Sequence, residues 1–252
     1  MTDSVPPPPP EGSPLLPPPP ATLHLHARAV PWQHAFAWFE EGMRLFRRAP
    51  ATWIGLGFCT IAAELATTAL PEVGPILAQI VSPLVAGGLA FAAAAADRGN
   101  APSLKHAVAA FGAPIRAMVA IVAANLVAFA GEALAAWFVA DVNLLAPGDG
   151  NELSTPAIVG MVALGILSSL PVAFVPFHAL LERAPPAEAF RASFAAFGLN
   201  TLPLLAYAAA ALVLVGLGAA TMGLGLLLAL PLLATAGYAA WKDIFGVRDA
   251  PG

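Results

Sequence analysis

The chain has 252 residues, of which 59% are hydrophobic and only 10% are charged, and its mean hydropathy is +0.78. Soluble domains are roughly 25% charged, so this composition predicts a membrane protein and argues against an ordinary soluble domain. The eleven Lys and Arg residues are too few and too scattered for a nucleic-acid-binding surface. With Cys59 as its single cysteine, the chain can form neither a disulfide framework nor a cysteine metal cluster.

Residues 1–30 contain two proline runs, Pro6 to Pro10 and Pro17 to Pro20. Proline runs favour extended polyproline II and offer nothing that could bury a core. The segment lacks the basic region, apolar core and cleavage site of a signal peptide. We therefore expect residues 1–30 to be a disordered cytoplasmic tail. A docking site for a proline-recognising module is the alternative interpretation.

Residues 31–50 predict an amphipathic helix that lies in the membrane interface. Aromatic and apolar side chains recur there at helical spacing, with charged side chains on the opposite face. Such a helix places its apolar face in the acyl boundary and its arginines among anionic headgroups. The candidates for headgroup binding are Arg44, Arg47 and Arg48, and the candidate interfacial anchors are Trp38, Phe39, Phe46, Trp53 and Trp241. A juxtamembrane anchor without lipid specificity is the simpler interpretation.

Six apolar stretches follow, each close to the roughly 20 residues that a bilayer-spanning helix needs. They cover 52–70, 74–96, 117–140, 157–181, 203–219 and 222–241, within a transmembrane domain of residues 51–246 that precedes a short tail over 247–252. Four glycines between Gly216 and Gly225 mark the turn between the last two stretches, because glycine tolerates the positive φ of a sharp reversal.

The basic residues predict the orientation of these spans. All eleven lie in four places: before the first stretch, between the second and third, between the fourth and fifth, and after the sixth. The other three connections contain no basic residue, and two of them, 71–74 and 141–156, hold acidic residues. Because cytoplasmic loops collect Lys and Arg, the pattern predicts six transmembrane helices with both termini in the cytoplasm.

The expected fold is an all-α polytopic bundle of three helical hairpins, each preceded by a short amphipathic segment. In each hairpin the returning helix carries a proline near mid-membrane, namely Pro83, Pro171 and Pro231. Proline frees a carbonyl one turn earlier and bends the helix, so we expect every returning helix to be kinked at a similar depth. The placement suggests a weak threefold repeat.

Motifs at both ends of this region resemble a known family. Residues Trp38 to Pro50 read W-x-x-E-G-x-R-L-F-R-R-x-P, residues Pro71 to Pro75 read P-x-x-G-P, and residues Tyr238 to Phe245 read Y-x-x-W-x-D-I-F. These motifs resemble an uncharacterised family of six-span proteobacterial inner-membrane proteins, distantly similar to the membrane domain of some glycerophosphodiester phosphodiesterases. The resemblance implies an integral protein of the bacterial inner membrane and brings no activity, cofactor or catalytic residue.

Two glutamates within the spans are the main candidates for a functional site, because ionisable groups in a membrane interior are costly. Glu64 lies in the first span, with Thr60 and Thr67 at i−4 and i+3 on its face. Glu132 lies in the third span, seven residues after Asn125 and hence on the same face. Both spans run outward, so the two carboxyl groups could occupy similar depths. The span interiors contain no basic side chain that could pair with them.

These carboxyl groups allow two interpretations. A proton- or cation-coupled path requires protonatable carboxylates within the membrane. Transporters usually show more polar lining or discontinuous helices than this sequence predicts, so structural glutamates that stabilise helix contacts or face an outer vestibule are favoured. His178, near the cytoplasmic end of the fourth span, is interpreted as an interfacial histidine.

No catalytic constellation, phosphate-binding glycine loop or metal-binding helix is evident, so we expect no enzymatic activity, cofactor or metal. The sequence favours a protein that binds or organises membrane lipids, or a membrane-protein partner or second copy of itself, through its cytoplasmic face. A small transporter or channel with a path through Glu64 and Glu132 is the alternative function.

Overall fold

The computed structural model describes residues 23–140 and 154–247, and every regular element in these two ranges is a helix. The long helices are α2 (Pro50–Thr68), α3 (Gly74–Asp97), α4 (Ile115–Ala140), α5 (Thr155–Ser169), α8 (Thr201–Ala220) and α9 (Leu226–Phe245). The shorter ones are α1 (His34–Arg47), η1 (Leu104–Gly112), η2 (Leu170–Val172), α6 (Val175–Leu181) and α7 (Pro186–Leu199). No strand occurs among the described residues, which confirms the all-α class. The predicted tail over 1–22, the connection 141–153 and residues 248–252 lie outside them.

Four helical segments are long and apolar enough to cross a membrane: α3, α4, α8, and α5 continued by η2. A fifth candidate is α1 together with α2, which are bent by 104° at the break between them. These helices fit a multi-pass membrane protein. α9 occupies the position of the predicted sixth span, but its last turn carries the charged Lys242 and Asp243. The six-span arrangement in three hairpins therefore stays a prediction.

Two of the three predicted kink positions lie within continuous helices. Helices α3 and α9 continue through Pro83 and Pro231. At Pro171, in contrast, the helix breaks: α5 ends two residues earlier, η2 follows, and α6 begins only at Val175. The expected kink is thus a discontinuity at this position, because Pro171 has no N–H with which to continue the α-helical ladder.

A buried serine satisfies the backbone groups that this break leaves open. Ser193 on α7, fully buried, accepts a hydrogen bond of 3.1 Å from the N–H of Phe174. Its hydroxyl donates a bond of 2.8 Å to the carbonyl of Pro171. Since unpaired backbone groups in a membrane interior are costly, this serine makes the break a stable feature of the fold.

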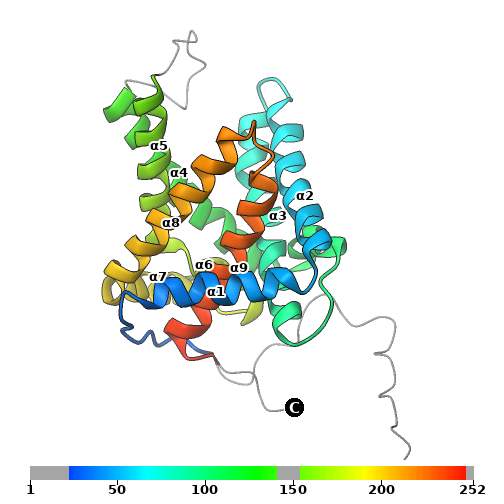
Figure 1. The fold of residues 1–252 in the computed structure, drawn as a ribbon, viewed down its shortest axis with the longest axis vertical. Helices are drawn as coiled ribbons and strands as arrows, with labels where there is room; N and C mark the ends of the chain where they lie inside the picture. The colour runs from blue at the N-terminus through cyan, green and yellow to red at the C-terminus, as the bar shows by residue number, and fades with distance from the viewer. Residues whose placement is uncertain (1–22, 141–153, 248–252) are drawn as a thin grey trace, which may run out of the picture.

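The packed core lies at one end of the bundle. Figure 1 shows α1 crossing that end, while the turns between α2 and α3 and between α8 and α9 lie at the opposite end. On α3 nearly every residue from Leu84 to Ala96 is buried, whereas no residue of α5 is. Most of the buried positions on α3 are alanine or glycine, and such small residues let helices approach closely. The bundle is therefore close-packed at the α1 end and looser at the other.

Helix α1 packs directly against α9. Its buried residues are Ala35, Trp38, Gly42 and Leu45. A Cβ atom added at Gly42 would lie only 2.7 Å from the backbone nitrogen of Ala236, so glycine is needed for this close approach. One face of the predicted interfacial helix thus meets protein.

The three predicted tryptophan anchors do not face the membrane interface. Trp38, Trp53 and Trp241 are only 2%, 0% and 3% exposed, so this prediction is wrong for them. Phe39 and Phe46 are half-buried and also contact protein, and the Phe39 ring stacks on Tyr207. Large aromatic rings bury more apolar area in a packed junction than at a lipid surface, which accounts for the difference.

Residues 23–30 lie against the same end of the bundle in an extended form. The N–H of Arg28 donates to the carbonyl of Ile244 at 2.8 Å. The N–H of Val30 donates to Oδ1 of the buried Asn200 at 2.8 Å. The prediction of a disordered tail is therefore wrong for residues 23–30, because specific partners on α9 and at the end of α7 bind their backbone.

The α1–α9 crossing yields a first prediction. Replacing Gly42 with alanine forces a Cβ against the Ala236 backbone and should destabilise the fold by about 1–3 kcal/mol. Gly198→Ala on α7 is the matched control, because an added Cβ there meets nothing within 4 Å. Thermal unfolding in detergent should give a lower midpoint for the first variant only. Equal midpoints for both variants would contradict the close crossing.

Candidate functional site

A cavity of about 400 Å³ lies between α2, α3, α4 and α5 in the looser half of the bundle. Its polar lining consists of Glu64, Gln79, Ser82, Asn125, Glu132 and Ser169. Three of these residues were predicted as intramembrane candidates, and the fold brings the two glutamates and Asn125 to the same cavity. The sequence placed the glutamates at similar depths but could not show that they face each other.

The two glutamates differ in their surroundings. The hydroxyl of Ser82 donates a hydrogen bond to the carboxylate of Glu64. Glu132 accepts no hydrogen bond from the described residues, and it lies beside Gly165, where an added Cβ would come within 3.5 Å of its Cγ. The charges of the two carboxylates are close enough to interact. Glu132 is therefore the carboxylate that is free to receive a ligand.

The amide side chains of the cavity bind one another. Nδ2 of Asn125 donates to Oε1 of Gln79 at 2.7 Å and links α4 to α3. The predicted candidates Thr60 and Thr67 do not belong to this polar group: their hydroxyls donate to the carbonyls of Leu56 and Ala63 one turn earlier, at 3.0 and 2.9 Å. The hydrogen-bonding capacity of these two hydroxyls is therefore used within their own helix, as is frequent for threonine in helices.

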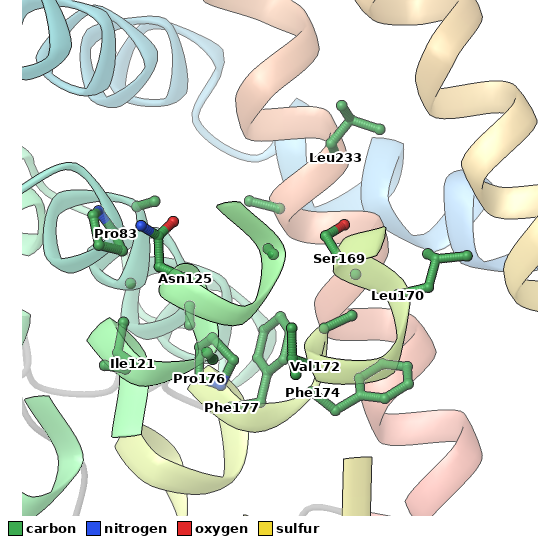
Figure 2. A pocket seen from close by; sticks show the side chains of 18 of the residues that line it. Pro83, Ile121, Asn125, Ser169, Leu170, Val172, Phe174, Pro176, Phe177 and Leu233 are labelled. Atoms are coloured by element: carbon green, nitrogen blue, oxygen red, sulfur yellow. The ribbon is translucent and has the colours of Figure 1, made fainter. Parts of the chain in front are cut away.

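A second cavity, of about 380 Å³ (Figure 2), adjoins the first. The two cavities share Asn125, Ala128 and Ser169 in their lining. No charged side chain lines the second cavity among the described residues, and Figure 2 shows Asn125 and Ser169 as the labelled polar side chains amid aromatic and aliphatic ones. A polar and an apolar space thus meet within one bundle.

The helix break lies at the junction of the two cavities. Ser169, the last residue of α5, lines both of them, and residues 170 and 172–174 of the break line the apolar one. Broken helices at membrane depth are tolerated where they are buried in protein or line a cavity. The break therefore contributes directly to the shape of the candidate site.

The α1 end carries a separate network of charged residues. Asp243 accepts hydrogen bonds from Arg28 Nη2 at 2.6 Å and Trp38 Nε1 at 2.9 Å, and it contacts His34 Nδ1 at 2.6 Å. Burial by itself would raise the pKa of Asp243, but the bonds to His34, Trp38 and Arg28 outweigh burial and hold this pKa below its usual value. The network ties the segment before α1 to the end of α9.

A buried acid–histidine group lies nearby. Glu182 is 3% exposed and contacts the rings of His178 at 2.7 Å and His24 at 2.8 Å. Burial raises the pKa of Glu182, but the bonds from His178 and from the His24 backbone outweigh it, so the pKa is lowered overall. His178 itself is fully buried, so its interpretation as an interfacial histidine is wrong.

The three arginines predicted to bind lipid headgroups differ in their contacts within the protein. Arg44 is hydrogen-bonded to Glu41 and lies 3.8 Å from Asp97, and Arg48 donates to a carbonyl at the end of α3. Arg47 is exposed and has no hydrogen-bond or ion-pair partner among the described residues. Only Arg47 is therefore placed to bind a lipid headgroup without first giving up a contact within the protein.

Comparison of the chain with protein-family models, curated proteins and solved structures finds no match in any of the three. The resemblance of the end motifs to an inner-membrane family therefore stays a prediction. In the fold these motifs meet, since Trp38 of the first motif binds Asp243 of the last.

The sequence anticipated part of the lining of the polar cavity, including Asn125, but it did not predict that an apolar cavity adjoins it. Apolar lining residues look like any other core residues in a hydrophobic chain, so no composition or spacing marks them. The only local signal was Pro171, which shows where a helix is disturbed but not what the disturbance encloses.

The two lowered pKa values predict an acid-dependent stability. Each carboxyl has a lower pKa in the folded protein than in the unfolded chain, so its contribution is present above the unfolded pKa of about 4 and is lost as pH falls through the folded pKa. The unfolding midpoint should stay level from neutral pH to about 5 and fall below about 4. The double variant Asp243→Asn, Glu182→Gln should be less stable at neutral pH and show a shallower acid loss. An unchanged acid slope in the variant would refute this assignment.

Proposed function

We propose that the chain is a six-span protein of the bacterial inner membrane, with both termini in the cytoplasm, that binds and transports a cation through the cavity at Glu64 and Glu132. The observation that carries the proposal is the shared cavity of these two carboxylates. Ionisable side chains that line a cavity within the membrane commonly mark ion or substrate paths.

Two further features favour transport over a purely structural role for the glutamates. Polar side chains from α3, α4 and α5 gather around the carboxylates. The helix break after Ser169 adjoins the same cavity, and discontinuous helices at the substrate site are typical of secondary transporters. The sequence alone predicted neither feature, which is why it favoured the structural interpretation.

The charge of the proposed ligand is inferred from the residues that line the cavity. No Lys or Arg side chain lines the cavity among the described residues, so a bound cation would be the counter-charge of the two carboxylates. The predicted orientation puts α1 on the cytoplasmic side. Glu64 lies near the end of α2 that leads into the α2–α3 turn, and Figure 1 shows this turn at the end of the bundle opposite α1, so this orientation puts the cavity in the outer half.

The proposal predicts that Glu132→Gln will lower cation uptake by about ten-fold or more, because the amide removes the charge without changing the shape. Uptake of radiolabelled methylammonium into proteoliposomes that contain the full chain is the measurement. Glu64→Gln should have a smaller effect, since Ser82 already binds that carboxylate. Glu40→Gln, at an exposed position on α1, is the control. Uptake that is equal in all variants would overturn the proposal.

The exposed side of α1 favours lipid binding as a second function of the cytoplasmic face. Phe36 is 65% exposed and Arg47 is exposed on the same helix, as a helix lying on anionic lipid requires. The same surface would suit a membrane-protein partner or a second copy of the chain. We favour lipid because one free arginine and an exposed aromatic ring are enough for it.

For this surface we predict that Arg47→Glu will weaken binding of phosphatidylglycerol about five-fold, the equivalent of roughly 1 kcal/mol for one basic residue. Its unfolding midpoint should stay unchanged. Arg44→Glu should instead lower the midpoint, because Arg44 binds Glu41 and lies near Asp97. Lipid retention by native mass spectrometry, together with thermal unfolding, separates the two effects. Unchanged lipid retention in Arg47→Glu would contradict the headgroup role.

A further inference from the structure

The polar cavity lies next to the apolar one. Asn125, Ala128 and Ser169 line both, so the two cavities adjoin at these residues. Each measures close to 400 Å³, and together they lie within the range of roughly 300–1,000 Å³ that is usual for ligand sites. An inorganic cation or a proton would use only the end that holds the glutamates.

The apolar cavity is shaped by elements from three parts of the chain. Pro83 comes from α3, and Phe174 and Phe177 follow the helix break (Figure 2). Tyr207 lies on α8. The Tyr207 hydroxyl donates to the carbonyl of Leu233 at 2.8 Å, so its polar group is already satisfied. The ring of Phe177 stacks on Trp241 at 5.9 Å, which fixes the wall at the packed end. The cavity therefore presents apolar surface in a fixed arrangement.

We propose that the substrate is an amphipathic organic cation, whose protonated amine lies at Glu64 and Glu132 and whose apolar body fills the cavity beyond Ala128. This inference rests on the proposed function and names its substrate class. The protonated amine is inferred from charge complementarity, because a carboxylate pair attracts an ammonium group and repels an anion. The apolar body is inferred from the uncharged lining of the second cavity, because transfer of an apolar group from water to such a cavity is favourable.

The same charge argument disfavours an anionic phospholipid as the occupant. Such a lipid would bring its phosphate to the two carboxylates, and no basic side chain among the lining residues offsets that repulsion. A neutral amphiphile would fit the apolar cavity but would leave Glu132 without a counter-charge. An amine with an alkyl or aryl body meets both conditions.

The test compares three probes on the full chain in lipid nanodiscs, with empty nanodiscs subtracted. The probes are 4-phenylbutylammonium, methylammonium and 4-phenylbutanoate. We expect 4-phenylbutylammonium to bind about ten-fold or more tightly than methylammonium, through the added apolar burial. We expect 4-phenylbutanoate not to bind. Calorimetric titration gives the dissociation constants.

Two variants separate this inference from the proposed function. Ala128→Leu narrows the junction of the cavities and should abolish the advantage of 4-phenylbutylammonium, while methylammonium binding is kept. Ala130→Leu, at an exposed position on the same helix, is the matched control. Gly237→Val enters the apolar cavity from α9 beside Tyr207 and Phe177, and it should act as Ala128→Leu does if that variant fails to fold.

The outcomes are distinct. Equal affinities for the two ammonium probes, with no effect of either cavity variant, would overturn the amphipathic substrate and leave cation binding in place. If Glu132→Gln leaves the binding of both ammonium probes unchanged, the proposed function itself is overturned. Binding of 4-phenylbutanoate at the strength of 4-phenylbutylammonium would show an apolar site without charge selection and would also overturn the inference.

Discussion

The close crossing of α1 over α9 is the contact on which the rest of the structure depends. Gly42 lets the two backbones meet, and Asp243 then binds Trp38 on α1 and Arg28 in the segment before it. Together these contacts bring both ends of the described chain to one end of the bundle. Close packing at that end leaves the other half of the helices splayed enough to enclose polar space.

The helix break at Pro171 is the second determinant of the candidate site. A continuous fourth helix would have carried α5 past the junction of the two cavities. Proline removes one ladder hydrogen bond, and Ser193 supplies partners for the groups that remain. The result is a stable discontinuity between a polar cavity with two carboxylates and an apolar cavity with aromatic walls, and our proposal of an amphipathic cation rests on this arrangement.

The sequence predicted the helices well because a membrane imposes strong local rules. Apolar length marks the spans, and the turn after α8 was expected from its glycines, of which Gly223 has a φ of +84°. It predicted less about side chains that meet across helices. Trp38 and Arg44 suit a lipid interface by composition, yet their partners, Asp243 and Asp97, lie far along the chain and were found only in the fold.

The sequence by itself therefore determined the all-α class, the approximate bounds of the long helices other than the broken fourth one, and the two carboxylates that a membrane interior makes costly. Only the tertiary structure decided that Glu64 and Glu132 line one cavity, that an apolar cavity adjoins it and that Pro171 breaks a helix. The physical reason is that hydropathy and charge act on each segment separately. A cavity, in contrast, is the space that several segments leave unfilled when they pack.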